Sequence, residues 1–344
     1  MKTSCFVQTL GVLALLGLSS QSLAQTTAAS DPVGFVTVNV PANSDAVLAV
    51  PLSRASVFKG VIQSISGNTI TVAGTSPAWT TNQFVQALPG QVNTYAVQIA
   101  SGTKEGMTGK VTANAANSVT IQLDPAEDLS GVQTEAVNGA GNGDHIDILP
   151  YWTPASLITS AVSNGSQILL LEATTAGINL SSSGSFGFDS GAWVDENTFE
   201  AADHAPLAFG RAFIFRNGGA SVGISMAGSV PMTKHRIIIR SFGAGDQDVA
   251  VGFSSPVPTR IGSVGLSFTE DDQLLVFDNT ASGQNKSASQ VLYYTTGDGW
   301  VDETFSPVGT SFMLQPGQGY IFRKKGTGAA GTFVWTALQS YLAP

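Results

Sequence analysis

The stretch Gly191–Phe199 reads GAWVDENTF, and Gly297–Phe305 reads the closely similar GDGWVDETF. The similarity continues downstream, where GRAFIFRN (210–217) corresponds to GQGYIFRK (317–324) at the same spacing as the two tryptophans. Because a set of phrases repeated at a fixed spacing is the signature of a duplicated structural unit, we expect one folding unit to occur twice in the second half of the chain.

The similarity also extends upstream with a small shift in spacing. GINLSSS (177–183) corresponds to GQNKSAS (283–289), which places Gly177 on Gly283 and Asn179 on Asn285. We therefore predict repeat unit 1 at 151–245 and repeat unit 2 at 246–344.

Apolar residues alternate with a period of two along most of the chain. The stretch 34–40 (GFVTVNV) sets three valines on one face, and 118–123 (SVTIQL) and 235–240 (HRIIIR) show the same alternation. This period predicts β-strands, whereas helical periodicity is confined to one short segment that begins at Thr153, where Pro154 follows a capping threonine. The fold class is therefore predicted to be all-β.

The amino-terminal part has a different organisation. SDAVLAVPLSR weakly echoes QDVAVGFSSPVPTR, so residues 25–55 are predicted to hold the first strands of repeat unit 1. Residues 56–150 then form an inserted module with its own strands, one hairpin of which turns at Gly67–Asn68. The complete prediction is two tandem β-sandwich-like repeat units with a small β-barrel-like module inserted near the N-terminus.

The first residues predict export. Lys2 precedes a short apolar run that ends in SLAQ, so residues 1–24 are expected to be a signal peptide. The run Leu10–Leu18 is far shorter than the ~20 residues of a membrane-spanning helix, and no transmembrane helix is expected in the mature chain. Removal of the signal peptide removes Cys5, the single cysteine, so the exported protein is expected to rely on its core and not on disulfides.

Charge excludes some classes of partner. Charged residues make up 11% of the chain and the net charge is −9, whereas a typical soluble domain has about 25% charged residues. A chain with few basic residues is poorly suited to nucleic acid or to anionic lipid.

A set of phrases resembles a known family. VGFVTVNVPANSDAVLAVPL, GNTITVAG, IASGTKEGM, VTANAANSVTIQL, PYWTPASL and PGQGYIFRK together are similar to an exported verrucomicrobial paralogous family, over nearly the whole mature chain. The resemblance implies export and a periplasmic, cell-surface or extracellular location. It supplies no catalytic residues.

The repeated aromatic residues are candidates for ligand binding. Trp193 and Trp300, with Phe213 and Tyr320, recur at equivalent positions, and one interpretation is that they form two sugar-stacking platforms. Packing of these rings in the core also explains their recurrence, and we favour that interpretation.

Other polar groups suggest weaker sites. Asn142, Asp144 and Asp147 lie in a Gly/Asn-rich segment whose oxygen atoms suit Ca²⁺, although their spacing matches no strict motif, and no other cofactor is expected. Arg216 and Arg323 end equivalent segments, and we expect them to pair with the acids of the repeated phrase, Asp195/Glu196 and Asp302/Glu303 respectively.

These observations favour an exported, non-enzymatic structural or interaction protein, acting by self-association or by binding a partner such as a surface glycan. Carbohydrate binding through the repeated aromatics is the alternative. A hydrolase is the third and least favoured hypothesis. The sequence has no G-x-S-x-G motif and no metal-ligand spacing of histidines, and its paired acids are typical of solvated turns.

Overall fold

Strands make up most of the regular secondary structure, as the alternation predicts. The computed structural model describes residues 31–74, 77–86, 90–171, 176–243, 245–265 and 268–342. The predicted signal peptide lies outside these residues. The helical elements of the described chain are all short: α1 (Glu135–Asn138), α2 (Pro154–Leu157), and the 3-10 helices η1 (Ile261–Ser263) and η2 (Ser340–Leu342). The all-β prediction is confirmed.

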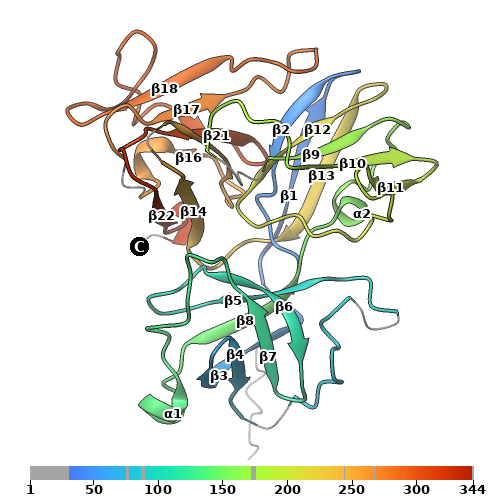
Figure 1. Cartoon of the computed structure of the whole chain (residues 1–344), viewed down its shortest axis with the longest axis vertical. Coiled ribbons are helices and arrows are strands. Elements are labelled where there is room, and N and C mark those ends of the chain that lie inside the picture. Colours follow the sequence, from blue (N-terminus) through green and yellow to red (C-terminus); the bar gives the residue numbers. More distant parts are fainter. Residues whose placement is uncertain are drawn as a thin grey trace, which may run out of the picture. The chain divides into compact units, whose positions relative to one another are not determined.

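The inserted module is a closed barrel of six strands (Figure 1). Around the barrel the order is β3 (Phe58–Ser66), β4 (Thr69–Val72), β7 (Ser118–Gln122), β6 (Thr108–Asn114), β5 (Tyr95–Ile99) and β8 (His145–Pro150). Gly67 adopts a φ of 57° in the turn between β3 and β4, as predicted for that hairpin. Inward-facing residues such as Ile62, Ile70 and Ile146 fill the interior with a hydrophobic core. The small barrel near the N-terminus is therefore confirmed.

Outside the barrel, the described residues form two five-stranded antiparallel sheets and three two-stranded pairs. The first sheet has the order β11 (Ala192–Asp195), β10 (Gly184–Asp189), β9 (Gln167–Leu170), β12 (Ala212–Arg216) and β2 (Asp45–Ala49). The second sheet has the order β19 (Gly299–Val301), β18 (Gln290–Thr295), β17 (Gln273–Val276), β21 (Gly319–Lys324) and β15 (Gln247–Gly252).

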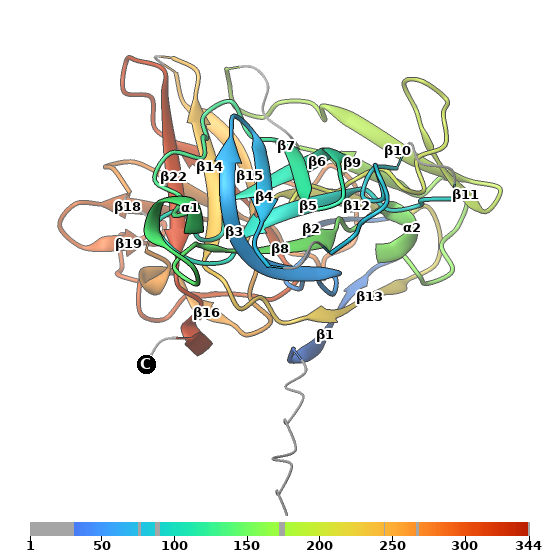
Figure 2. The ribbon, with the colours of Figure 1, turned by 90° about the horizontal axis from the view of Figure 1, so that it is seen from below.

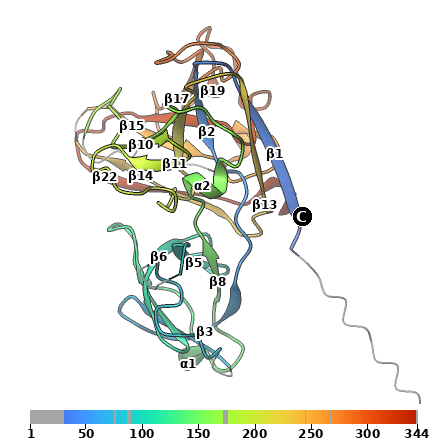
Figure 3. The same cartoon turned by 90° about the vertical axis from the view of Figure 1, so that its right-hand side faces the viewer.

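The two sheets correspond strand by strand. β12 pairs with β2 so that Arg216 lies opposite Asp45, and β21 pairs with β15 so that Arg323 lies opposite Asp248. Each sheet is accompanied by a two-stranded ribbon: β1 (Val33–Val40) pairs with β13 (Val222–Ser229) (Figure 3), and β14 (His235–Ser241) pairs with β22 (Gly331–Ala337).

This correspondence supports the predicted duplication, which itself stays a prediction, as do its boundaries. β14 lies within the range predicted for repeat unit 1 but pairs with β22, which lies in the range of repeat unit 2. A shorter pair, β16 (Thr259–Arg260) with β20 (Met313–Leu314), corresponds to the isolated bridge between Trp152 and Leu207.

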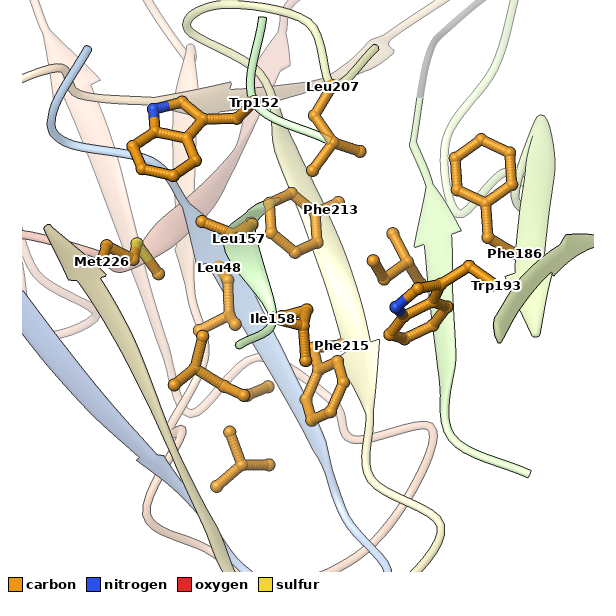
Figure 4. Close-up of a cluster of buried hydrophobic side chains, with 14 of the residues drawn as sticks. Leu48, Trp152, Leu157, Ile158, Phe186, Trp193, Leu207, Phe213, Phe215 and Met226 are labelled. Atoms are coloured by element: carbon orange, nitrogen blue, oxygen red, sulfur yellow. The ribbon is translucent and has the colours of Figure 1, made fainter. Parts of the chain in front are cut away.

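Each sheet has hydrophobic residues on both faces. One face of the first sheet packs with the β1–β13 ribbon around Phe213, Phe215 and Met226 (Figure 4). One face of the second sheet packs in the same way with the β14–β22 ribbon. The remaining faces meet in a small central cluster of Val47, Ala49, Ala212 and Ala250. Strand β2 (DAVLA) is buried along its whole length because both of its faces are covered.

The predicted helix at Thr153 is present. Thr153 caps α2: its side chain accepts from the backbone N–H of Ser156, and the Ser156 side chain accepts from the backbone N–H of Thr153. Among the described residues, every helix is too short to traverse a lipid bilayer.

Strand β14 and the residue before it, Lys234, contact acidic side chains of the barrel module. Arg236 pairs with Glu127 at 2.8 Å, Lys234 pairs with Glu105 at 3.0 Å, and Arg240 contacts Asp124. Arg236 and Arg240 lie on the opposite face of β14 from the buried Ile237 and Ile239, so one face of the strand packs in a core while the other contacts the barrel module.

Candidate functional site

The four aromatic residues predicted as sugar platforms lie in the hydrophobic cores. Trp193 and Trp300 are each 2% exposed, and Phe213 and Tyr320 are 3% and 1% exposed. Figure 4 shows Trp193 near Phe186 and Phe215 within the first core. Rings this deeply buried have no free face on which a sugar can stack, so their recurrence reflects packing.

The three residues predicted to hold Ca²⁺ belong to separate hydrogen-bond networks. The Asp144 carboxylate accepts from Ser101 Oγ at 3.1 Å and from the backbone N–H of Gln133 at 2.8 Å. Asp147 accepts from Ser56 Oγ, and the Asn142 amide donates to a backbone carbonyl. Across the described ranges, no three His, Cys, Asp or Glu side chains gather in a way that could hold a metal ion. The Ca²⁺ site stays a prediction.

The expected partners of the two arginines were wrong. Arg216 forms a bidentate pair with Asp45, with Nε–Oδ1 at 2.8 Å and Nη2–Oδ2 at 2.9 Å. Arg323 forms the same pair with Asp248, at 2.7 and 2.9 Å. In both cases the acid lies directly across the sheet on the neighbouring edge strand, so the strand register brings the two side chains together.

Each pair is completed by an asparagine from the other half of the molecule. Asn285 accepts from Arg216 Nη2 at 2.8 Å and donates its backbone N–H to Asp45 at 2.7 Å. Asn179 accepts from Arg323 Nη2 at 3.2 Å and donates its backbone N–H to Asp248 at 2.8 Å. The segment GINLSSS (177–183) therefore contacts the second sheet through Asn179, and GQNKSAS (283–289) contacts the first sheet through Asn285.

Small residues let the sheets approach closely at their centre. The backbone N–H of Ala49 donates to Gly317 O at 3.0 Å, and the equivalent N–H of Gly252 donates to Gly210 O at 2.8 Å. A Cβ added at Gly252 would collide with the Cβ of Ala49. Equivalent positions thus contact one another, as in an isologous dimer interface.

Larger side chains surround a cavity of about 580 Å³ between the sheets, which we call the intersheet cavity. Its apolar walls come in equivalent pairs from the two sheets. They are Val47 and Ala250, Leu169 and Leu275, Leu171 and Phe277, and Ile214 and Ile321. The cavity is therefore formed by matching faces of both sheets.

Polar side chains line the rest of the intersheet cavity. Arg216 and Asp45 reach it, together with Glu196, which accepts from Gln167 Nε2 at 2.7 Å. Lys286 also lines it, and its Nζ donates to the carbonyls of Asp278 and Ala281. Burial lowers the pKa of Lys286, whereas the hydrogen bonds to Asp45 raise the pKa of Arg216. The cavity thus combines apolar walls with fixed polar groups.

The arginine at the intersheet cavity leaves one donor free of partners in the described part of the chain. Within the described residues, Nη1 of Arg216 donates to no protein acceptor, while its Nε and Nη2 are fully engaged. A ligand could therefore accept from Nη1 without displacing any of these partners. This arrangement suits recognition of a polar group on an otherwise apolar molecule.

Comparison with protein-family models, with curated proteins and with solved structures finds no match to this chain.

The sequence contains a signal for the Arg–Asp pairs. The echo between SDAVLAV and QDVAVGF places Asp45 and Asp248 at the start of corresponding strands. Strand pairing, not closeness in the chain, decides which acid meets each arginine.

Proposed function

We propose that the protein is an exported, non-enzymatic interaction protein that binds a small amphipathic molecule in the intersheet cavity. The observation that carries this proposal is the cavity itself: about 580 Å³, with apolar walls and a few fixed polar groups. This size and lining are typical of small-molecule sites, which range from about 300 to 1,000 Å³.

The charges favour a neutral ligand. Arg216 and Lys286 bring positive charge to the cavity, and Asp45, Asp248 and Glu196 bring negative charge. Asp45 and Asp248 are each engaged by an arginine, and Lys286 is held by carbonyls. Side chains committed to such mutual contacts are suited to positioning a ligand, which supports a binding role over proton transfer.

A neutral dye tests the proposal. Nile red should bind the full chain with a saturable rise in fluorescence. Leu169→Trp, which fills the cavity from the first sheet, should weaken binding at least tenfold, and Leu275→Trp should do the same from the second sheet. Val137→Trp changes an exposed residue of the barrel and should bind like the wild type. Thermal unfolding of each variant confirms that it is folded. Unchanged binding by both filled variants would contradict the proposal.

A further inference from the structure

Two large apolar side chains stand exposed at the ends of the repeated phrases. Phe199 is 83% exposed and Phe305 is 73% exposed. They occupy equivalent places, each in the turn that follows the outermost strand of its sheet, β11 or β19. A single exposed apolar residue is ordinary, but the same exposed ring at two equivalent sites calls for an explanation.

The backbone at both phenylalanines is unusual. Each has a φ of 60°, in the left-handed region that bulky residues rarely adopt. The turns are closed by isolated bridges, Val194 with Ala201 and Val301 with Pro307, and Phe199 N–H donates to Asp195 O at 2.7 Å. Glycine or asparagine would satisfy this conformation with less strain. The backbone conformation therefore does not require phenylalanine at either position.

Side chains within each turn hold it rigid. Asp195 Oδ1 accepts from the backbone N–H groups of Asn197 and Thr198, at 2.8 and 3.1 Å. Asp302 Oδ1 accepts from those of Thr304 and Ser306, at 2.8 and 3.0 Å. Each ring is therefore presented on a pre-organised turn, which lowers the entropic cost of binding. The Phe305 ring also stacks on Tyr293, with 6.5 Å between the ring centroids, and it still remains largely exposed.

We propose that Phe199 and Phe305 are two equivalent docking tips for a neutral polysaccharide. The C–H groups of a sugar ring carry partial positive charge and suit the negative face of a phenyl ring. Sugar hydroxyls can donate to the carboxylates of residues near the phenylalanines in the chain, Glu200 at the first turn and Glu303 at the second, where Oε1 of Glu303 also accepts from the backbone N–H of Val291 at 3.2 Å. Both tips thus offer an apolar face next to hydrogen-bond acceptors.

The surrounding negative charge disfavours anionic partners. Asp195, Glu196 and Glu200 flank the first tip, Asp302 and Glu303 flank the second, and the whole chain carries a net charge of −9. Anionic lipids and acidic polymers would be repelled. A second copy of the chain would bring the same acids together, so self-association through the tips is also disfavoured. A neutral polymer meets no such repulsion.

The placement of the tips predicts crosslinking. Strands β11 and β19, which precede the two turns, lie at opposite sides of the molecule (Figure 2). One ring strengthens association by only about tenfold to a hundredfold, so each tip alone binds weakly. Tips on opposite sides engage different polymer strands and would connect them. This site is separate from the intersheet cavity and does not depend on ligand binding there.

Affinity gel electrophoresis and turbidity distinguish the roles of the tips. The full chain is run in native gels that contain xyloglucan, glucomannan or starch, with alginate and phosphatidylcholine vesicles as alternative probes. The wild type should be retarded by at least one neutral polysaccharide and should raise the turbidity of its solution. Phe199→Asn and Phe305→Asn should each bind about tenfold more weakly without raising turbidity, and the double variant should show no retardation.

Matched variants separate this proposal from the cavity. Val137→Asn removes an equally exposed apolar residue of the barrel, and Leu169→Trp fills the intersheet cavity. Both should bind polysaccharide and raise turbidity like the wild type. Three results would overturn the proposal: retardation by none of the neutral polysaccharides, wild-type binding by the double variant, or phenylalanine-dependent binding to alginate or vesicles alone. Crosslinking by a single variant at the wild-type level would overturn the two-tip arrangement.

Discussion

The first and second sheets carry different residues at one pair of equivalent buried positions, which we call the junction: Asn217 and Ser166 in the first sheet, and Lys324 and Asp272 in the second. In the first sheet the junction is neutral: the Asn217 amide donates to the carbonyls of Pro41 and Ala220, at 3.0 and 2.7 Å. Ser166 Oγ accepts the backbone N–H of Gly218 at 3.0 Å. Every contact here is a hydrogen bond between uncharged groups.

In the second sheet the equivalent residues are ionic. Lys324 takes the place of Asn217, and Asp272 takes the place of Ser166. Lys324 Nζ lies 2.9 Å from both Asp272 oxygens, contacts Thr269 Oγ1, and sits 4.8 Å above the centre of the Phe333 ring. The lysine and aspartate side chains are 2% and 0% exposed.

The difference shows that the same arrangement of strands can be built with either neutral hydrogen bonds or a buried ion pair. The two sheets should nevertheless differ in how much stability they lose when one partner is removed. Loss of a neutral partner leaves an unsatisfied dipole, whereas loss of one member of a buried ion pair leaves an isolated charge. The second sheet should therefore depend more heavily on its junction than the first.

The largest expected effect breaks the ionic junction. Lys324→Met leaves Asp272 charged and buried, and we expect the free energy of unfolding to fall by about 3–5 kcal/mol. Urea denaturation followed by circular dichroism measures this change. Asn217→Leu is the matched change in the first sheet and should cost about 1–3 kcal/mol. Equal losses in the two variants would show that charge does not distinguish the junctions.

A double variant tests directly whether the buried charge makes the second junction more sensitive to substitution. Lys324→Asn combined with Asp272→Ser places in the second sheet the two neutral residues that the first sheet has at the equivalent positions, Asn217 and Ser166. The double variant should be more stable than Lys324→Met, because it leaves no buried charge unpaired.

The second expected effect concerns acid pH. His235, at the start of β14, is fully buried, and burial lowers its pKa to about 3. Its Nδ1 accepts from the Ser254 backbone N–H at 3.4 Å, while Nε2 has no partner among the described residues. The unfolded chain, with a histidine pKa near 6.5, binds the proton more readily. Stability is therefore expected to fall as the pH drops below about 6.5, by roughly 1.4 kcal/mol per pH unit, until the pH approaches 3.

This effect should distinguish the two ribbons. The equivalent strand β1 (VGFVTVNV) carries no ionisable side chain. Amide hydrogen exchange at pH 4.5 should therefore show β14 and β22 opening before β1 and β13. His235→Gln should remove this contribution to the pH slope, and a slope that persists unchanged in that variant would assign it to other groups.

The third prediction concerns Ala49 and Gly252, which occupy equivalent positions in the two sheets and differ by one methyl group. Gly252→Ala places a methyl group against Ala49, and we expect a loss of about 1–3 kcal/mol from overpacking. Combining it with Ala49→Gly moves the methyl group to the other sheet and should recover part of the loss. Thermal unfolding of the single and double variants measures the coupling. A double variant as unstable as the sum of the single variants would contradict this geometry.

The smallest expected effect is a gain. Asn179 and Asn285 show that left-handed positions elsewhere in this chain carry asparagine, with φ of 53° and 51°. Phe199→Asn should therefore stabilise the fold by about 1 kcal/mol by relieving backbone strain. Phe199→Ala removes the ring but keeps a Cβ in the strained conformation, so it should leave stability nearly unchanged. Equal stability of the two variants would show that the turn stores no strain.

Local patterns were sufficient to predict the strands and the barrel. Alternation of valine and isoleucine identified strands such as β1 and β14, and Gly67 with Asn68 marked a hairpin of the barrel. These features depend on residues close together in the chain, where side-chain period and turn chemistry act directly.

The site could not be predicted in the same way. The acids of the repeated phrase are much closer in sequence to Arg216 than Asp45 is, yet strand pairing brings Asp45 opposite the arginine. The intersheet cavity depends on how two sheets pack through Ala49 and Gly252, and no sequence period records that distance. Trp193 and Trp300 are buried because they lie on the face of each sheet that packs against its ribbon, and the sequence does not record which face that is.

The chain enters and leaves the barrel at one place. Arg54 Nη1 donates to Tyr151 O at 3.2 Å, and Trp152 Nε1 donates to Leu52 O at 2.8 Å, so the ends of the insertion are side by side. In the second half a short connection from β15 to β16 spans the same interval. The barrel could therefore be lengthened, exchanged or deleted in evolution without any change in the strand order of the two sheets. The basic residues of β14 would then need other acidic partners, or would have to be replaced.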